Sequence, residues 1–60
     1  MYKILICDDE KDIVSALKIY LEAEGYETLS AYNGEEALNI IEEKEVHLLL
    51  MEPRVQLPFI

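Results

Sequence analysis

The chain has 60 residues and a mass of 7.0 kDa, with 13 acidic and 5 basic side chains, a formal net charge of −8 and a pI near 4.3. Because 52% of the residues are hydrophobic, the composition excludes a disordered acidic tail, and the negative charge argues against nucleic-acid binding. One Cys cannot form an internal disulfide, and no apolar run approaches the roughly 18 residues that span a bilayer. We therefore expect a folded, cytoplasmic protein without a membrane segment.

The first half of the chain predicts a strand followed by a helix. Residues 2–7 form a continuous apolar run that stops at Asp8 and Asp9, as a buried parallel strand would. In residues 12–24 apolar side chains recur at helical spacing, and Gly25 follows where a helix C-cap belongs. The expected apolar stripe of this helix consists of Ile13, Val14, Ala16, Leu17, Tyr20 and Leu21.

The second half repeats the alternation of strand and helix and adds a third strand. Residues 26–32 predict a strand less buried than the first, which ends at Asn33-Gly34. An Asn-Gly pair often makes a hairpin turn, but the apolar face and acidic first turn of residues 35–43 favour a helix with Asn33 or Gly34 near its N-cap. Residues 46–51 form a second continuous apolar run of strand length.

This order of elements predicts a parallel α/β sheet with right-handed crossovers. If the first strand lies between the others, the strand order is 2-1-3 and the helices cover opposite faces. Ligands of open α/β sheets bind beyond the carboxyl ends of the strands, where Asp8, Asp9 and Glu52 would converge. Repulsion among three carboxylates favours a hard divalent cation such as Mg²⁺. In a structural alternative, Asp8 caps the following helix, while Asp9 and Glu10 favour its dipole.

Four stretches of the chain carry a family pattern: KILICDDE at residues 3–10, LEAEGYE at 21–27, AYNGEEAL at 31–38 and LLLM at 48–51. With these motifs the sequence resembles the receiver domain of two-component response regulators. Within that family it is similar to the DNA-binding transcription-factor branch typified by vancomycin-resistance and phosphate regulators. The resemblance covers residues 2–51, roughly the first half of such a domain, and implies a truncated flavodoxin-like β-α-β-α-β fold.

The resemblance also implies a phosphorelay role, with a sensor histidine kinase as a partner that docks partly on the first helix. Receiver domains hold Mg²⁺ with the acidic pair after the first strand and accept a phosphoryl group on an Asp that ends the third. Asp8 and Asp9 match the pair, whereas Glu52 stands at the acceptor position. The longer Glu side chain displaces the carboxylate, and a shift of about 1 Å can cost roughly a hundredfold in rate. We expect a vestigial Mg²⁺ site of weak affinity, no phosphorylation at Glu52 and no enzymatic activity.

Residues 52–60 depart from the family pattern, since position 56 is Gln, Pro falls at 58 and no Asp-Gly follows. We interpret residues 1–51 as a partial receiver domain and residues 52–60 as a divergent tail of a truncated, frameshifted or excised fragment without an output domain. Several alternatives stay open. They are a residual Mg²⁺-dependent phosphoacceptor at Asp9 or Glu52, a charge at Glu52 that imitates the phosphorylated state, and a decoy that binds a histidine kinase.

In the expected strand order, the outer edge of the third strand would have no neighbouring strand. Unpaired backbone groups beside apolar side chains invite edge pairing, and a chain this short buries only about 60% of its unfolded surface. We predict a homodimer in which third strands pair antiparallel into a six-stranded sheet, or an exchange of a strand or the tail. The residues of this edge are Leu48, Leu49, Leu50 and Met51.

Two further residues have simple structural interpretations. Cys7 precedes two acidic residues, which raise rather than lower a thiol pKa, so we expect a small buried hydrophobic side chain rather than a nucleophile. His47 has no Ser or Cys placed by a motif to complete a triad, so we expect a structural imidazole. Neither residue predicts catalysis.

Overall fold

The computed structural model describes residues 1–55, so residues 56–60, which make up most of the predicted tail 52–60, lie outside the described residues. All five predicted elements are present, and their ends lie within two residues of the expected positions. The strands are slightly shorter than the apolar runs because the outermost residues of each run make no ladder pair. In chain order they are β1 (Lys3–Cys7), α1 (Lys11–Ala23), β2 (Glu27–Ala31), α2 (Gly34–Glu43) and β3 (Leu48–Met51).

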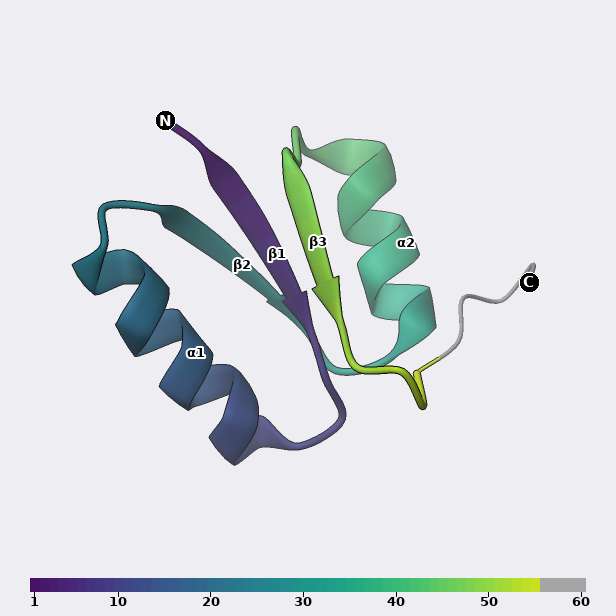
Figure 1. The fold of residues 1–60 in the computed structure, drawn as a ribbon. Helices are drawn as coiled ribbons and strands as arrows, with labels where there is room; N and C mark the ends of the chain where they lie inside the picture. Colours follow the sequence, from purple (N-terminus) through teal and green to yellow (C-terminus); the bar gives the residue numbers. More distant parts are fainter. Residues whose placement is uncertain (56–60) are drawn as a thin grey trace.

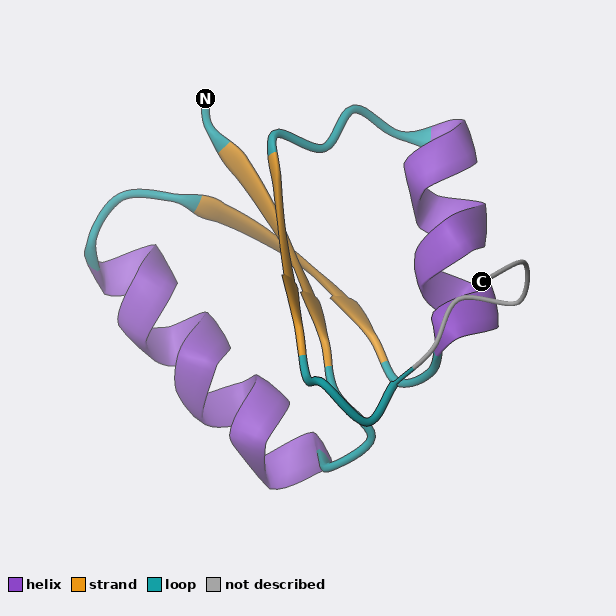
Figure 2. Cartoon of the chain, turned by 45° about the vertical axis from the view of Figure 1, so that its right-hand side comes forward, coloured by secondary structure: helices purple, strands orange, loops and turns teal. Residues whose placement is uncertain are grey.

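The three strands form one parallel sheet in the order β2-β1-β3, with β1 in the centre (Figure 1). Cys7, the last residue of β1, lies opposite Ala31 of β2 and Met51 of β3. The helices cover opposite faces of the sheet (Figure 2), as right-handed crossovers on either side of a central strand require. The predicted order 2-1-3 and the flavodoxin-like β-α-β-α-β arrangement are therefore confirmed.

Both faces of β1 are buried, which explains why its sequence is a continuous apolar run rather than an alternating one. Successive side chains of a strand point to opposite faces, so β1 supplies two separate cores. On the α1 face the cluster consists of Ile4, Ile6, Leu17, Leu21, Leu50 and Val14. On the α2 face it consists of Leu5, Cys7, Leu29, Ala31, Ala37, Ile40, Val46, Leu49, Met51 and Val55.

The apolar stripe predicted for α1 is wider than the stripe that the sheet covers. Val14 is buried and packs on the sheet, together with Leu17. Ile13 and Tyr20 were expected in the same stripe, but they are 39% and 63% exposed. At 100° per residue they lie on one flank of the line through Val14 and Leu17, and a helix touches a sheet along a narrow line. Both side chains thus belong to the apolar stripe of the sequence but not to the part of it that the sheet buries.

The helix ends follow local sequence signals. Gly25, with φ of 96°, ends α1, its N–H donating to the carbonyl of Glu22 and the next N–H donating to the carbonyl of Leu21, which is a Schellman motif. At the start of α2, Asn33 Oδ1 accepts the N–H of Glu36 at 2.9 Å. Both predicted caps are confirmed.

Candidate functional site

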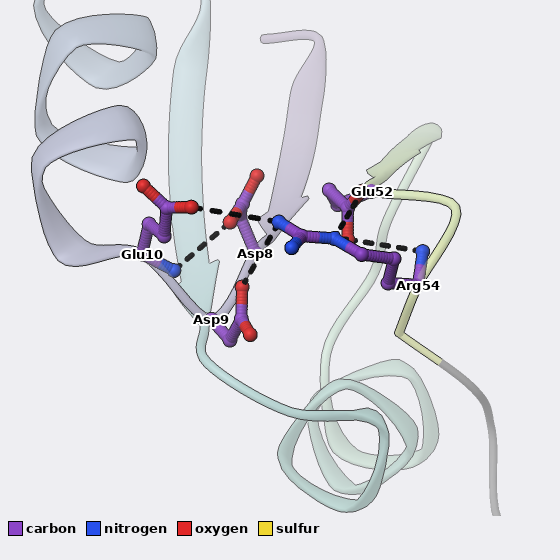
Figure 3. Close-up of polar contacts among 5 residues, drawn as sticks. All are labelled: Asp8, Asp9, Glu10, Glu52 and Arg54. Atoms are coloured by element: carbon purple, nitrogen blue, oxygen red, sulfur yellow. Dashed lines mark hydrogen bonds and ion pairs between the residues drawn. The ribbon is translucent and has the colours of Figure 1, made fainter.

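Asp8 and Glu52 follow directly on β1 and β3, and the parallel register brings them together. The last pair of the ladder joins Cys7 and Met51, and the N–H of Glu52 donates to the carbonyl of Cys7 at 3.0 Å. Asp8 and Glu52, the next residues of the two segments, therefore lie together at the carboxyl end of the sheet (Figure 3). We call Asp8, Asp9, Glu10 and Glu52 the carboxylate corner.

Asp8 is only 6% exposed, and its side chain holds the turn that leads into α1. Its Oδ1 accepts the N–H of Glu10, two residues ahead, at 2.9 Å. This is an Asx turn rather than a helix cap, because Glu10 itself is the N-cap residue and makes no side-chain capping bond. The alternative in which Asp8 helps to cap the following helix is therefore met only indirectly, because Asp8 binds the N–H of the N-cap residue and not an N–H of α1 itself.

Arg54 lies across the carboxylate corner and contacts carboxylates from two chain segments (Figure 3). Its Nε donates to both oxygens of Glu52, at 3.0 and 3.1 Å, and its backbone N–H donates to Oε2 of Glu52 at 3.0 Å. Its Nη2 lies 3.4 Å from Oε1 of Glu10 and 4.0 Å from Oδ1 of Asp9. The corner is thus bridged by a guanidinium.

Sequence reasoning missed Arg54, although a signal was present. Arg54 is the only Lys or Arg in residues 45–60, and it follows the predicted acidic site by two positions. Hydrogen bonds and charge from Glu52, followed by the charge of Asp9, raise the pKa of Arg54 above its ordinary value. The guanidinium is therefore a permanent cation at the carboxylate corner.

Cys7 lies beside the corner but has no nucleophilic character. Its side chain is buried among the apolar residues of the α2 face. Burial raises the pKa of the Cys7 thiol, and the charges of Asp8 and Glu36 raise it further. The interpretation of Cys7 as a buried hydrophobic side chain is confirmed.

The carboxylates do not form a ready-made metal site. Carboxylate oxygens suit Mg²⁺, but one oxygen of Asp8 is bonded to the turn and both oxygens of Glu52 are bonded to Arg54. Within residues 1–55, no three His, Cys, Asp or Glu side chains are arranged to hold a metal ion. The predicted set of Asp8, Asp9 and Glu52 thus does not fit Mg²⁺ in this arrangement.

A second region of interest is the outer edge of β3. In the part of the chain that the structure describes, β3 pairs only with β1. Leu48 is 41% exposed, and a cavity of about 490 Å³ opens between this strand and α1. The cavity is lined by Tyr2, Ile4, Leu21, Tyr26, Leu48 and Leu50. The described structure therefore has an apolar groove next to an open strand edge.

His47 has a structural role at the start of the same strand pair. Its Nδ1 accepts the N–H of Lys3 at 2.9 Å, and its ring stacks on Tyr2 with 5.1 Å between the ring centroids. The predicted structural interpretation of His47 is confirmed.

No helix among residues 1–55 is both long enough and apolar enough to cross a lipid bilayer.

Comparison with known proteins gives one family. Residues 4–58 match the family model described as the response regulator receiver domain. The chain is 45% identical over 49 residues to the response regulator GtcR of Aneurinibacillus migulanus, covering 82% of this chain and 20% of that protein. It is 40% identical over 52 residues to the transcriptional regulatory protein CpxR of Escherichia coli (strain K12), covering 87% of this chain and 22% of that protein. The chain therefore spans about a fifth of the length of these relatives, and no solved structure matches it significantly.

Proposed function

Because the chain belongs to the receiver domain family of two-component response regulators, we propose that it is a receiver fragment of a phosphorelay which does not accept a phosphoryl group. The observation that carries this proposal is the state of Glu52, which stands at the carboxyl end of β3 with both carboxylate oxygens bonded to Arg54. Asp8 and Asp9 remain as the acidic pair of the family, and any Mg²⁺ affinity of this vestigial site is weak.

Two physical arguments support the absence of phosphorylation. An attacking carboxylate oxygen must point at the phosphorus atom, whereas Nε and the backbone N–H of Arg54 fix the direction of the Glu52 carboxylate and draw on its charge. The additional methylene of Glu52, relative to Asp, also moves the carboxylate away from the position that the family uses. Displacements of about 1 Å are enough to reduce such a reaction by roughly a hundredfold.

Incubation with acetyl phosphate and Mg²⁺, followed by intact-mass measurement, tests this proposal. We expect the mass of the unmodified chain, and beryllofluoride should leave the amide chemical shifts of Asp8, Asp9 and Glu52 unchanged. A stoichiometric, acid-labile adduct would contradict the proposal and support the alternative of a residual phosphoacceptor. The variant Glu52→Gln would then identify the acceptor, because it removes an adduct at Glu52 and retains one at Asp9.

The partner that the family suggests is a sensor histidine kinase, which a fragment of this kind would bind as a decoy. The observation that favours a docking surface is the pair of exposed apolar side chains Ile19 and Tyr20 on α1, 71% and 63% exposed. A reduced, buried Cys7 fits the cytoplasm, which we take as the compartment. Competition of the chain with an intact receiver domain for a histidine kinase, measured as slower phosphotransfer, tests the decoy role. Unchanged phosphotransfer at excess fragment would refute it.

We infer that the second partner is another copy of the chain, bound through the outer edge of β3. A two-fold axis perpendicular to the sheet preserves its faces, and directly opposed residues of antiparallel strands share a face. Residues of β3 alternate between the faces, so the axis must pass through a residue rather than between two. With the axis at Leu49, Leu48 faces Leu50 of the partner on the α1 face, where each copy has its apolar groove. The dimer would contain one six-stranded sheet.

A further inference from the structure

Arg54 reaches the carboxylate corner because a turn and a core contact fix its position. The N–H of Val55 donates to the carbonyl of Glu52 at 3.0 Å, which closes a β-turn with Pro53 at its second position. Val55 packs against the core of the α2 face, and the N–H of Glu52 is bonded to Cys7. Both ends of the turn are thus attached to the sheet. Arg54 therefore has a defined direction although its side chain is 67% exposed.

The guanidinium joins the two segments that flank the corner. Glu52 comes from the end of β3, whereas Asp9 and Glu10 come from the loop after β1. Glu10 is 44 positions from Arg54 in the sequence. An Arg side chain suits this role because its planar group offers five donors in several directions and stays charged. One cation thus contacts three of the four carboxylates of the corner.

We propose that the Arg54 guanidinium takes the place of a divalent cation at the carboxylate corner and keeps such a cation out. This inference rests on the proposed function only in taking the corner as the counterpart of the family's cation site. A metal ion at Glu52 competes with Nε and the backbone N–H of Arg54 for the charge and lone pairs of the same carboxylate. A metal ion that binds beside Arg54 also meets a like charge. For a divalent ion about 5 Å from one positive charge in a water-like dielectric, this repulsion alone weakens binding by about tenfold.

Titration of the 60-residue chain with Mn²⁺, followed by paramagnetic broadening of the amide signals of Asp8, Asp9 and Glu52, tests the inference. The variant Arg54→Gln removes the charge and retains hydrogen-bonding capacity, and we expect it to bind Mn²⁺ about tenfold more tightly than the unmodified chain. The variant Arg54→Lys retains the charge and should stay within about threefold of the unmodified chain, because its charge still repels the metal ion.

A matched control separates the local contact from the change in net charge. Lys44→Gln changes the net charge by the same amount at the exposed end of α2, and it should leave the Mn²⁺ affinity nearly unchanged. Equal affinity of Arg54→Gln and the unmodified chain, equal gains in Arg54→Gln and Lys44→Gln, or no broadening in any variant would each overturn the inference. Circular dichroism verifies that the variants are folded. Phosphorylation is read separately by mass, so a failure of the proposed function is not confused with a failure of this inference.

Discussion

The carboxylate corner and the outer edge of β3 adjoin each other, but they satisfy their polar groups in different ways. At the corner, Glu52 and Arg54 are two residues apart, and a short turn is enough to pair their charges. Along the edge, the main-chain donors and acceptors of β3 have no partner strand among residues 1–55, and a turn cannot supply one. Charges can be neutralised locally, whereas a strand edge requires another strand. The corner is therefore closed internally, and the edge is open to a partner.

The largest expected effect comes from placing a charge at the open edge. In the variant Leu48→Lys, each copy would bring an ammonium group against an apolar residue of the partner, so we expect the dimer dissociation constant to rise by about a hundredfold or more. Sedimentation velocity measures this change. The control Ile19→Lys introduces the same charge at an exposed position of α1, away from the edge, and should dissociate the dimer much less. Equal effects of the two substitutions would show that the edge is not the interface.

The affinity of the dimer should also depend on ionic strength. Each chain carries a formal charge of −8, so two copies repel one another and salt screens that repulsion. Raising NaCl from about 0.05 to 0.5 M should tighten the dimer by roughly threefold to tenfold, because the Debye length falls below the separation of most charges. Weaker association at high salt would instead indicate an interface held by opposite charges.

The buried Cys7, which ends the central strand beside the carboxylate corner, predicts a loss of stability at alkaline pH. Its pKa is raised in the folded state, so its contribution to stability is fully present below the ordinary thiol pKa and is lost as the pH rises through the raised value. The free energy of unfolding should therefore fall above about pH 8.5. Urea denaturation at several pH values measures this fall. A fall just as steep in Cys7→Ala would assign it to other groups.

The smallest expected effect concerns the link between α1 and β2, which lies away from both regions. Thr28 donates to Oε2 of Glu22 at 2.7 Å and, together with Lys18, lowers the pKa of Glu22. The contribution of a carboxylate with a lowered pKa is present above its ordinary pKa and is lost as the pH falls through the lowered value. Thermal melts between about pH 5 and 3, which bracket the ordinary Glu pKa, measure this loss. The melting temperature of Thr28→Val should fall slightly less steeply with decreasing pH than that of the unmodified chain. An unchanged slope would contradict this assignment.

The parts of the fold that sequence could predict are those governed by local rules. The left-handed Gly25 and the cap at Asn33 depend on residues within four positions, and the continuous apolar run of β1 follows from burial on both faces. Local sequence rules could not predict how much of the apolar stripe of α1 contacts the sheet. Helical spacing places Ile13 and Tyr20 near the apolar stripe, but only the position of the sheet determines which side chains it covers.

The candidate site was predictable to the same extent. The order of the elements predicts parallel strands, but the order 2-1-3, which brings Asp8 beside Glu52, was conditional on a central first strand. The bridge from Arg54 to Glu10 depends on the shape of a turn and on a contact across 44 positions, which no pattern in the chain encodes. Sequence reasoning expected a weak Mg²⁺ site at this corner, whereas in this structure the guanidinium of Arg54 lies against its carboxylates.

Arg54 neutralises the carboxylate corner from within the chain, whereas we expect the edge of β3 to bind a second copy. Sedimentation equilibrium of the 60-residue chain over about a hundredfold dilution tests this expectation most directly, because mass action makes a dimer concentration-dependent. We expect the mass of two chains at high concentration and a fall toward the 7.0 kDa of one chain on dilution. A constant mass of 7.0 kDa with an intact circular dichroism spectrum at every concentration would contradict it.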